Sequence, residues 1–315
     1  MKYTTPHIVQ YQGSKRKLAP QILPLLPRNF KRMIEPFSGM AAMTIATAKE
    51  GRCGEFWIND INEPLVGVLK EAINDPKSLI HNYKDIWDEQ FTYSNGSEAH
   101  YYYIREIFNN GNHTPSVMLY LLARCVKGAV RYGSNGNFNQ SPDKRRNGTN
   151  PSTLATNVYS ISKLLKGKCI FSSIDYKQVF EGAEDGDILY LDPPYQGVCT
   201  GRDNRYFSGI DFDEFIDSLQ SLVDRGIMFI LSYDGFCGEK EYGEKLPAEL
   251  GLHKMLLDAG ISTQSLFNGD KLRTKEALYI SPSLINKGEY ICPTALSFKP
   301  KKETYLPLPG SLRIG

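Results

Sequence analysis

The chain lacks the sequence features of a metalloprotein, a secreted protein and a membrane protein. None of its six cysteines forms a Cys-x-x-Cys pair, and its five histidines show no ligand spacing near them, so no structural zinc is expected. The residues before Gln12 contain no apolar stretch like that of a signal peptide. No apolar run approaches the roughly 20 residues that a membrane span needs. These absences predict reduced thiols, no metal, no membrane partner and a cytoplasmic location.

The chain also lacks a large net charge and the glycine motifs of common nucleotide-binding proteins. In its 315 residues, 37 Lys and Arg nearly balance 35 Asp and Glu, which leaves a formal net charge of +2. A nucleic-acid surface must therefore be a local basic patch. There is no Gly-x-Gly-x-x-Gly and no phosphate loop ending in Gly-Lys-Ser/Thr, which argues against NAD and ATP.

What is present begins with two strand and helix units. Residues 32–39 are typical of a short buried strand that ends in a tight turn, and residues 40–49 of a helix with small side chains. A second strand over residues 55–58 ends in Asn59-Asp60, and residues 63–73 have the apolar spacing of a helix. This alternation predicts a parallel sheet.

The alternation stops after residue 74, where a helical insertion is expected over residues 75–160. The helical patterns cover residues 78–89, 101–109 and 117–127. Residues 131–148 within the insertion are rich in turn-forming and basic side chains, which is typical of a protruding hairpin or loop.

Strand patterns return in the second half of the chain. They cover residues 169–171, 187–191 and 227–232, with a helical pattern over residues 213–223. Residues 264–267 and 276–280 are close enough in sequence to form an antiparallel hairpin at a sheet edge. The sequence therefore predicts an α/β fold whose sheet is mostly parallel with one antiparallel edge strand.

The clearest chemical pattern is Asp192-Pro193-Pro194-Tyr195, which directly follows an apolar strand. Prolines cannot continue a central strand, and they supply carbonyl acceptors without N–H donors. We interpret Asp192 and the Pro193 carbonyl as acceptors for the two protons of an exocyclic amine, and Tyr195 as a ring that stacks on the base. A loop that merely ends the strand is the alternative.

Three motifs in a fixed order carry a resemblance to a known family. They are Tyr11-Gln12-Gly13-Ser14-Lys15, then Glu35-Pro36-Phe37-Ser38-Gly39, and then Asp192-Pro193-Pro194-Tyr195 after the long insertion. The chain resembles the Dam-type (class alpha) DNA adenine-N6 methyltransferases, and within them the EcoRV-type modification enzymes. The likeness extends to Arg131-Tyr132 and to Glu276-Ala277-Leu278, so it covers most of the chain.

The resemblance implies S-adenosylmethionine as the methyl donor and a Rossmann-like catalytic domain built from residues 1–74 and 161–305. It also implies that residues 75–160 form a helical target-recognition insert with a hairpin that enters DNA. The cofactor site would contain Tyr11, Gly13, Lys15, Glu35, Phe37, Gly39, Asp60, Asp175, Tyr176 and Asp192. For Tyr11 and Lys15 the alternative is a solvated basic segment, and for Asp60 it is a cap of the next helix.

Double-stranded DNA is the expected partner, and the insert supplies the expected contacts. Phosphate contacts are predicted for Arg131, Lys144, Arg145 and Arg146, base contacts for Asn137 or Asn139, and insertion into the base stack for Tyr132 or Phe138. Alternatively, Phe138 anchors the hairpin and the Lys-Arg-Arg run is an exposed turn. The sequence Phe138-Asn139-Gln140-Ser141-Pro142 departs from the usual Phe-Asn-Val-Pro, which argues against GATC specificity.

The predicted function is therefore site-specific methylation of the N6 amine of a flipped adenine. Two alternatives stay open: an N4-cytosine or RNA methyltransferase, which needs the same acceptors, and a catalytically silent DNA-binding regulator. A cognate restriction endonuclease is expected to act in the same system without forming a stable complex.

Overall fold

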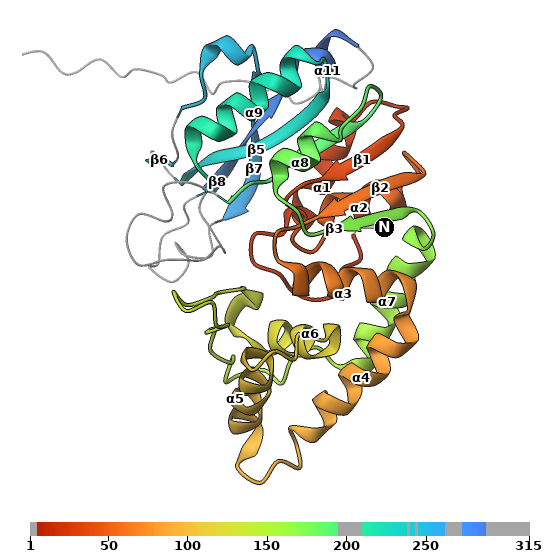
Figure 1. Ribbon diagram of the computed structural model, residues 1–315, viewed down its shortest axis with the longest axis vertical. Coiled ribbons are helices and arrows are strands. Elements are labelled where there is room, and N and C mark those ends of the chain that lie inside the picture. Colours follow the sequence, from red (N-terminus) through yellow and green to blue (C-terminus); the bar gives the residue numbers. More distant parts are fainter. Residues whose placement is uncertain (1–4, 195–209, 238–239, 243–244, 262–272, 288–315) are drawn as a thin grey trace, which may run out of the picture.

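The computed structural model describes residues 5–194, 210–237, 240–242, 245–261 and 273–287. Two parts are visible in Figure 1: a sheet covered by helices, and a lobe of helices beneath it. The chain enters the lobe after the second strand of the sheet and returns to form the third.

The sheet has the strand order β3-β2-β1-β4-β5-β8-β7, with the short β6 paired to β5. Its strands are β1 (Arg32–Glu35), β2 (Glu55–Asn59), β3 (Cys169–Ser172), β4 (Ile188–Leu191), β5 (Met228–Cys237), β6 (Lys240–Tyr242), β7 (His253–Ile261) and β8 (Arg273–Ile280). The strands from β3 through β5 are parallel, and β8 runs antiparallel to both of its neighbours. The predicted mixed, Rossmann-like sheet with a reversed strand is confirmed, and this strand, β8, lies next to the edge strand β7.

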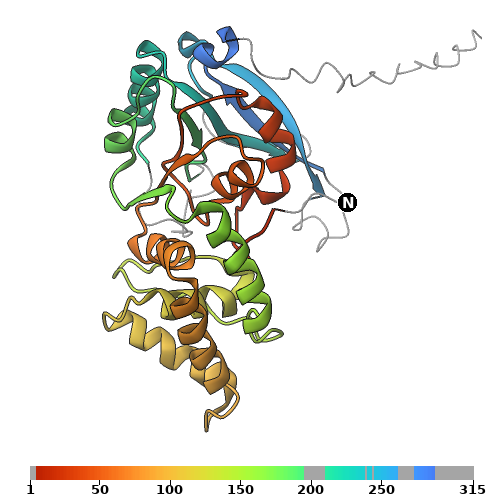
Figure 2. The same ribbon diagram turned by 90° about the vertical axis from the view of Figure 1, so that its right-hand side faces the viewer.

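Alternate residues of the strands face two separate apolar layers, as the two-residue period of a strand requires. Met33 and Ile188 pack into the larger cluster, whereas Ile34 and Leu189 pack into the smaller one. The smaller cluster is closed by α8 (Tyr176–Glu181) and α9 (Phe212–Asp224). These two helices lie in front of the sheet in Figure 1 and to one side of it in Figure 2.

The larger cluster is closed by helices from the first half of the chain. They are η1 (Lys15–Lys17), α1 (Ala19–Ile22), η2 (Leu23–Leu25), α2 (Ala42–Lys49) and α3 (Glu63–Asn74). The remaining short elements, η4 (Ala248–Leu250) and α11 (Pro282–Asn286), flank the last strands.

The helical lobe contains α4 (Pro76–Glu89), α5 (Gly96–Asn109), α6 (Pro115–Arg124), η3 (Val126–Gly128) and α7 (Pro151–Leu165). The helix α3 packs against both α6 and α7, and α2 also packs against α7. Buried residues of the lobe therefore belong to the same apolar cluster as one face of the sheet. Among the described residues, the lobe shares its core with the sheet.

Most predicted elements are present with shifted ends. The helix expected from Met40 begins at Ala42, after a turn in which Ala41 adopts φ +52°. Residues 264–267 lie outside the described part of the chain, and the antiparallel neighbours of β8 within it are β5 and β7, of which β7 had not been predicted. The expected boundary at residue 160 falls inside α7, so the division into domains stays a prediction. No helix among the described residues is long and apolar enough to cross a membrane.

The shared core predicts that the lobe and the sheet unfold together. Leu119 in the middle of α6 is fully buried, so Leu119→Ala should lower the free energy of unfolding by about 2–5 kcal/mol. Circular dichroism and tryptophan fluorescence during thermal unfolding should still report one transition. The matched control is Leu256→Ala on β7, because Leu256 is 48% exposed. A separate early transition in the Leu119 variant would contradict the shared core.

Candidate functional site

A cavity of about 240 Å³ lies at the carboxyl ends of the parallel strands, where open α/β sheets bind their ligands. All ten residues predicted for the cofactor site line it. They are Tyr11, Gly13, Lys15, Glu35, Phe37, Gly39, Asp60, Asp175, Tyr176 and Asp192. Pro193 and Pro194 also line the cavity, as do Arg131 and Tyr132 from the hairpin. Tyr195 lies outside the described residues.

The Lys15 ammonium lies between two carboxylates in this cavity. Its Nζ is 3.0 Å from Oδ1 of Asp192 and 2.9 Å from Oε1 of Glu276. The Lys15 side chain is only 8% exposed, so it is not the solvated basic residue of the alternative interpretation. Burial raises the pKa of Asp192 to about 6; Lys15 lowers it and Glu276 raises it further.

Glu35 shapes the cavity by capping a helix. Its carboxylate accepts hydrogen bonds from the backbone N–H groups of Met43 (3.3 Å) and Thr44 (2.8 Å) at the start of α2. The N-cap residue of α2, Ala41, has no side chain that caps the helix, so Glu35 takes that role from the end of β1. Burial raises the pKa of Glu35 to about 7.

Asp60 holds the turn after β1 against the turn after β2. The Gly39 N–H donates to its Oδ2 at 2.8 Å, and the Asn62 N–H donates to its Oδ1 at 3.0 Å. Burial raises the pKa of the Asp60 carboxyl. The helix after Asp60 is capped by the Asn62 side chain, which accepts from Leu65 N, so Asp60 does not serve as the helix cap of the alternative interpretation.

Gly39 is required by the geometry of this turn. Its φ is +50°, and a Cβ added there would lie 2.8 Å from Cε1 of Tyr11. Only glycine adopts such a backbone conformation without strain while allowing a ring this close. The first two sequence motifs therefore meet in space at Gly39 and Tyr11.

An aromatic wall closes the side of the cavity next to α8. The rings of Phe37 and Tyr176 are 5.4 Å apart, and both pack against Phe215 of α9. Asp175 begins α8, because its Oδ1 accepts a hydrogen bond from the Lys177 N–H at 2.8 Å. The structure thus supplies an apolar surface beside a carboxylate.

Two residues that hold the cavity together had not been predicted. The Asn59 side chain donates to the carbonyls of Pro36 (2.9 Å) and Ile174 (3.0 Å), which fixes the loops after β1 and β3 to the end of β2. The Gln12 N–H donates to the Gly128 carbonyl at 3.0 Å, which fixes the amino-terminal motif to η3 in the lobe. Gly128 has φ +60°, and a Cβ there would lie 2.0 Å from the Gln10 carbonyl oxygen.

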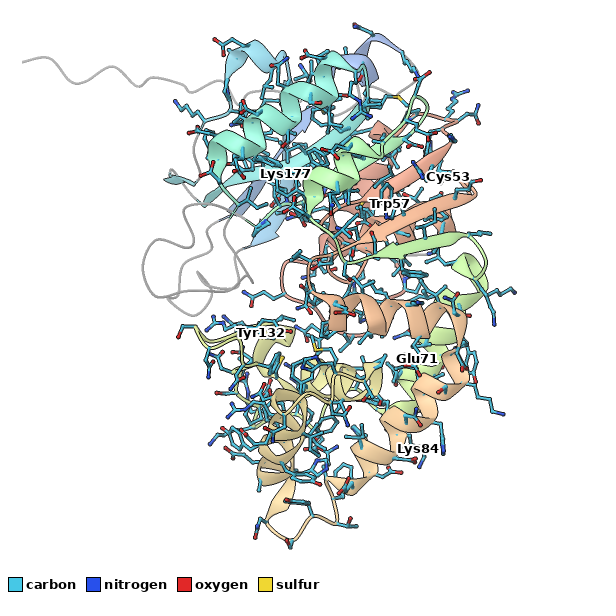
Figure 3. All side chains as sticks on the ribbon, in the orientation of Figure 1. Cys53, Trp57, Glu71, Lys84, Tyr132 and Lys177 are labelled. Carbon is cyan, nitrogen blue, oxygen red and sulfur yellow. The ribbon has the colours of Figure 1, made fainter. Side chains whose placement is uncertain are left out.

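The predicted hairpin forms a tight turn over residues 131–139. The Gly133 N–H donates to the Asn137 carbonyl at 2.8 Å, and the Asn139 N–H donates to the Arg131 carbonyl at 3.0 Å. The side chains of Asn137 and Asn139 are exposed. Figure 3 shows Tyr132 at the end of the lobe that faces the sheet, where its hydroxyl contacts Oδ1 of Asn62 at 3.3 Å.

Phe138 anchors this hairpin to the lobe. Its ring is 1% exposed and lies 5.9 Å from the rings of both Phe108 and Tyr132. Its backbone N–H donates to Asn109 Oδ1, and its carbonyl accepts from Asn109 Nδ2. Of the two interpretations of Phe138, the contacts support anchoring, which leaves Tyr132 as the candidate for insertion into DNA.

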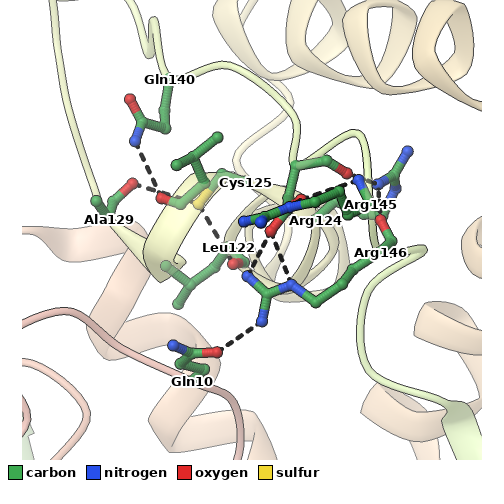
Figure 4. Close-up of polar contacts among 10 residues, drawn as sticks. Gln10, Leu122, Arg124, Cys125, Ala129, Gln140, Arg145 and Arg146 are labelled. Atoms are coloured by element: carbon green, nitrogen blue, oxygen red, sulfur yellow. Dashed lines mark hydrogen bonds and ion pairs between the residues drawn. The ribbon is translucent and has the colours of Figure 1, made fainter. Parts of the chain in front are cut away.

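The predicted basic run is partly tied into the protein. Asp143 accepts hydrogen bonds from the Arg145 N–H (3.0 Å) and from Arg146 Nε (2.8 Å), and Arg146 also donates to Gln10. Figure 4 shows these contacts around the buried Arg124, which donates to the Asp143 and Arg146 carbonyls. Lys144 and Arg145 side chains remain 74% and 86% exposed, although Lys144 also contacts Glu98.

A comparison with known protein families shows to which family the chain that carries this site belongs. The model of the D12 class N6 adenine-specific DNA methyltransferases matches residues 11–256 of the chain. The chain belongs to this family. The methyltransferase therefore transfers a methyl group to the N6 amine of adenine in DNA, and the resemblance found in its motifs is confirmed.

Individual relatives of the methyltransferase have a modest sequence identity to it, but the aligned regions cover most of each chain. The type II methyltransferase M1.LlaDCHI of Lactococcus lactis subsp. cremoris is 25% identical over 260 residues, which cover 78% of this chain and 86% of that protein. The type II methyltransferase M.MjaIII of Methanocaldococcus jannaschii is 28% identical over 219 residues, covering 65% and 74%. The retron Ec67 DNA adenine methylase of Escherichia coli is 27% identical over 230 residues, covering 71% and 76%.

The described side chains of the site indicate whether they could hold a metal ion. Among the described residues, no three His, Cys, Asp or Glu side chains are placed to share a metal ion. The individual roles of the cavity residues remain predictions.

The close approach at Gly39 predicts that Gly39→Ala impairs the methyltransferase. The left-handed backbone and the Tyr11 contact together cost roughly 1–3 kcal/mol, so methyl incorporation into DNA should fall by about 5- to 150-fold. Gly54→Ala is the matched control, because a Cβ at Gly54 meets no atom within 4 Å. Equal incorporation by both variants, measured with a labelled methyl donor, would show that the turn tolerates a side chain.

Proposed function

We propose that the methyltransferase transfers the methyl group of S-adenosylmethionine to the N6 amine of an adenine flipped out of double-stranded DNA. The observation that carries this proposal is the position of Asp192. Its carboxylate lies at the end of β4, in the same cavity as every residue predicted for the cofactor. Methyl transfer requires that acceptor and donor groups meet in one place.

The residues of the cavity fit S-adenosylmethionine in charge and in shape. When bound, this cofactor supplies a methyl group activated by a positively charged sulfur. Asp192, Glu35 and Asp60 surround the cavity with carboxyl groups that favour a cation. The missing side chain of Gly39 leaves room beside Tyr11 for close approach to the backbone. The Phe37 and Tyr176 wall suits the adenine ring of the cofactor, next to Asp175.

Asp192 and the Pro193 carbonyl would activate the target amine. The lone pair of an exocyclic adenine amine is delocalised into the ring, which makes the amine a poor nucleophile. Two acceptors for the amine protons favour a geometry in which the lone pair points out of the ring plane toward the methyl group. Asp192 must be ionised to accept such a hydrogen bond. Tyr195, which would stack on the base, lies outside the described residues.

The helical lobe would deliver DNA to this cavity. Arg131 and Tyr132 line the cavity from the hairpin side, so a duplex held by the hairpin would lie next to Asp192. Residues 75–160 are accordingly proposed as the target-recognition insert, with Asn137 and Asn139 exposed for base contacts. Eversion of the base costs roughly a few kcal/mol. Arg131, which lines the cavity, is proposed to contact phosphates near the flipped nucleotide.

A restriction endonuclease that acts at the same DNA site is a further proposed element of the system. It is supported by two relatives whose names are those of type II methyltransferases. The nuclease would share the DNA sequence with the methyltransferase without forming a stable complex.

The catalytic role of Asp192 predicts a large loss of activity and a defined pH dependence. Asp192→Ala should reduce the formation of N6-methyladenine at least about 100-fold, while much of the DNA affinity remains. In the wild-type enzyme the rate should fall as the pH drops through about 6, the pKa of buried Asp192, because the protonated carboxyl no longer accepts the amine proton. The measurement is nucleoside analysis of DNA after incubation with labelled S-adenosylmethionine.

Asp217→Ala is the matched control, since Asp217 is exposed on α9. An active Asp192→Ala enzyme would eliminate the proposed mechanism. Label recovered in cytosine or RNA would support the alternative substrates. Cofactor binding without any transfer by the wild-type protein would support the silent DNA-binding regulator.

The basic run predicts a contribution to DNA affinity that depends on salt. Replacing both Lys144 and Arg145 by Ala should weaken binding to all DNA sequences and reduce the slope of log Kd against log salt concentration by about 2, one for each lost phosphate contact. Fluorescence anisotropy at several salt concentrations measures this slope. The control is Lys163→Ala on α7 combined with Lys166→Ala directly after it. The helix α7 lies on the other side of the lobe from the hairpin. An unchanged slope would make the run an ordinary exposed turn.

A further inference from the structure

Glu276 contacts Lys15, which lines the cavity, although no sequence motif assigned Glu276 a role there. It is on β8, the reversed strand, and its side chain is 13% exposed. Its Oε1 lies 2.9 Å from the Lys15 ammonium and accepts a hydrogen bond from the Ser232 hydroxyl at 2.5 Å. Ser232 is fully buried in the middle of β5. One carboxylate oxygen of Glu276 is thus fixed from two sides.

The same ammonium contacts Oδ1 of Asp192 at 3.0 Å. Lys15 belongs to a 3-10 helix of only three residues, so this short element alone gives its long side chain little restraint. A lysine side chain loses rotamer entropy when it is held in one conformation. A second anion on the far side of the ammonium offsets that loss and determines where the ammonium points.

We propose that Glu276 is a positioning residue for methyl transfer: it holds the Lys15 ammonium against Oδ1 of Asp192 and shares its charge, so that Oδ2 of Asp192 is oriented to accept the adenine amine. This inference rests on the proposed function, since it assigns the geometry of the same acceptor. A single ammonium paired only with Asp192 would neutralise that carboxylate and weaken it as an acceptor. Sharing the ammonium with Glu276 leaves Asp192 more negative.

The charges around Asp192 determine how variants should change its ionisation. Lys15 faces it from η1, Glu276 from β8, and Glu35 from the end of β1. Lys15 lowers the pKa of Asp192, and Glu276 raises it. Removing the Glu276 charge should therefore extend activity to lower pH, although the maximal rate falls. Such a shift is not expected from a purely structural defect.

The test compares two conservative variants of Glu276 in the full-length enzyme. Glu276→Gln keeps the length and the hydrogen-bonding oxygen but removes the charge. We expect kcat for DNA methylation to fall about 10- to 100-fold, KM for DNA to change by less than about threefold, and the acidic limb of the pH profile to move to lower pH. Glu276→Asp keeps the charge but shortens the side chain, so kcat should fall without this downward shift. Lys15→Gln should move the limb to higher pH.

Glu249→Gln provides the matched control, because Glu249 is exposed in η4, and thermal unfolding of every variant measures stability. The inference would be overturned if Glu276→Gln had the wild-type kcat and the acidic limb of its pH profile did not move. A loss that follows the unfolding temperature in both variants, with no change in pH profile, would also overturn it. Absence of methyl transfer by the wild-type enzyme would instead refute the proposed function.

Discussion

A buried ammonium between two carboxylates joins three parts of the chain that are far apart in sequence. Lys15 comes from the amino-terminal segment, Asp192 follows β4, and Glu276 lies on β8. Because an unpaired charge in this position would be costly, the amino-terminal segment must be docked accurately before the site is complete. The Gln12 hydrogen bond to Gly128 provides that docking from the helical lobe. The lobe therefore helps to build the cavity, in addition to its proposed role in binding DNA.

A second chain of contacts links the recognition hairpin to the proposed cofactor site. Phe138 anchors the hairpin, Tyr132 packs against Phe138, and the Tyr132 hydroxyl contacts Asn62. The Asn62 N–H in turn donates to Asp60, which holds the Gly39 turn. Continuous packing between lobe and sheet makes these contacts part of one body. A displacement of the hairpin by DNA would consequently reach the Gly39 turn, which is proposed to approach the cofactor.

The sequence predicts the strand ends well because each one joins an apolar strand to a polar or proline-rich turn. Asp60 and Asp192 were found in this way, since parallel strands bring their carboxyl ends to one edge. Asn59, Gly128 and Glu276 were not assigned to the site, because their roles depend on neighbours distant in sequence. In the sequence, Glu276 stands out as a charged residue beside the apolar residues of β8. Its partner Lys15, however, lies 261 positions earlier in the chain, the difference between residue numbers 276 and 15.

The basic run shows why charge patterns alone do not identify DNA contacts. Its residues have similar charges in the sequence, yet Asp143 and Gln10 hold Arg146 while Arg145 stays largely exposed. The backbone of the run is fixed by the buried Arg124, which donates to the carbonyls of Asp143 and Arg146. A cation already paired inside the protein gains less from a phosphate, because its existing hydrogen bonds must first break. In a chain with a net charge of only +2, the exposed cations around the hairpin are therefore better candidates for phosphate contacts than the paired ones.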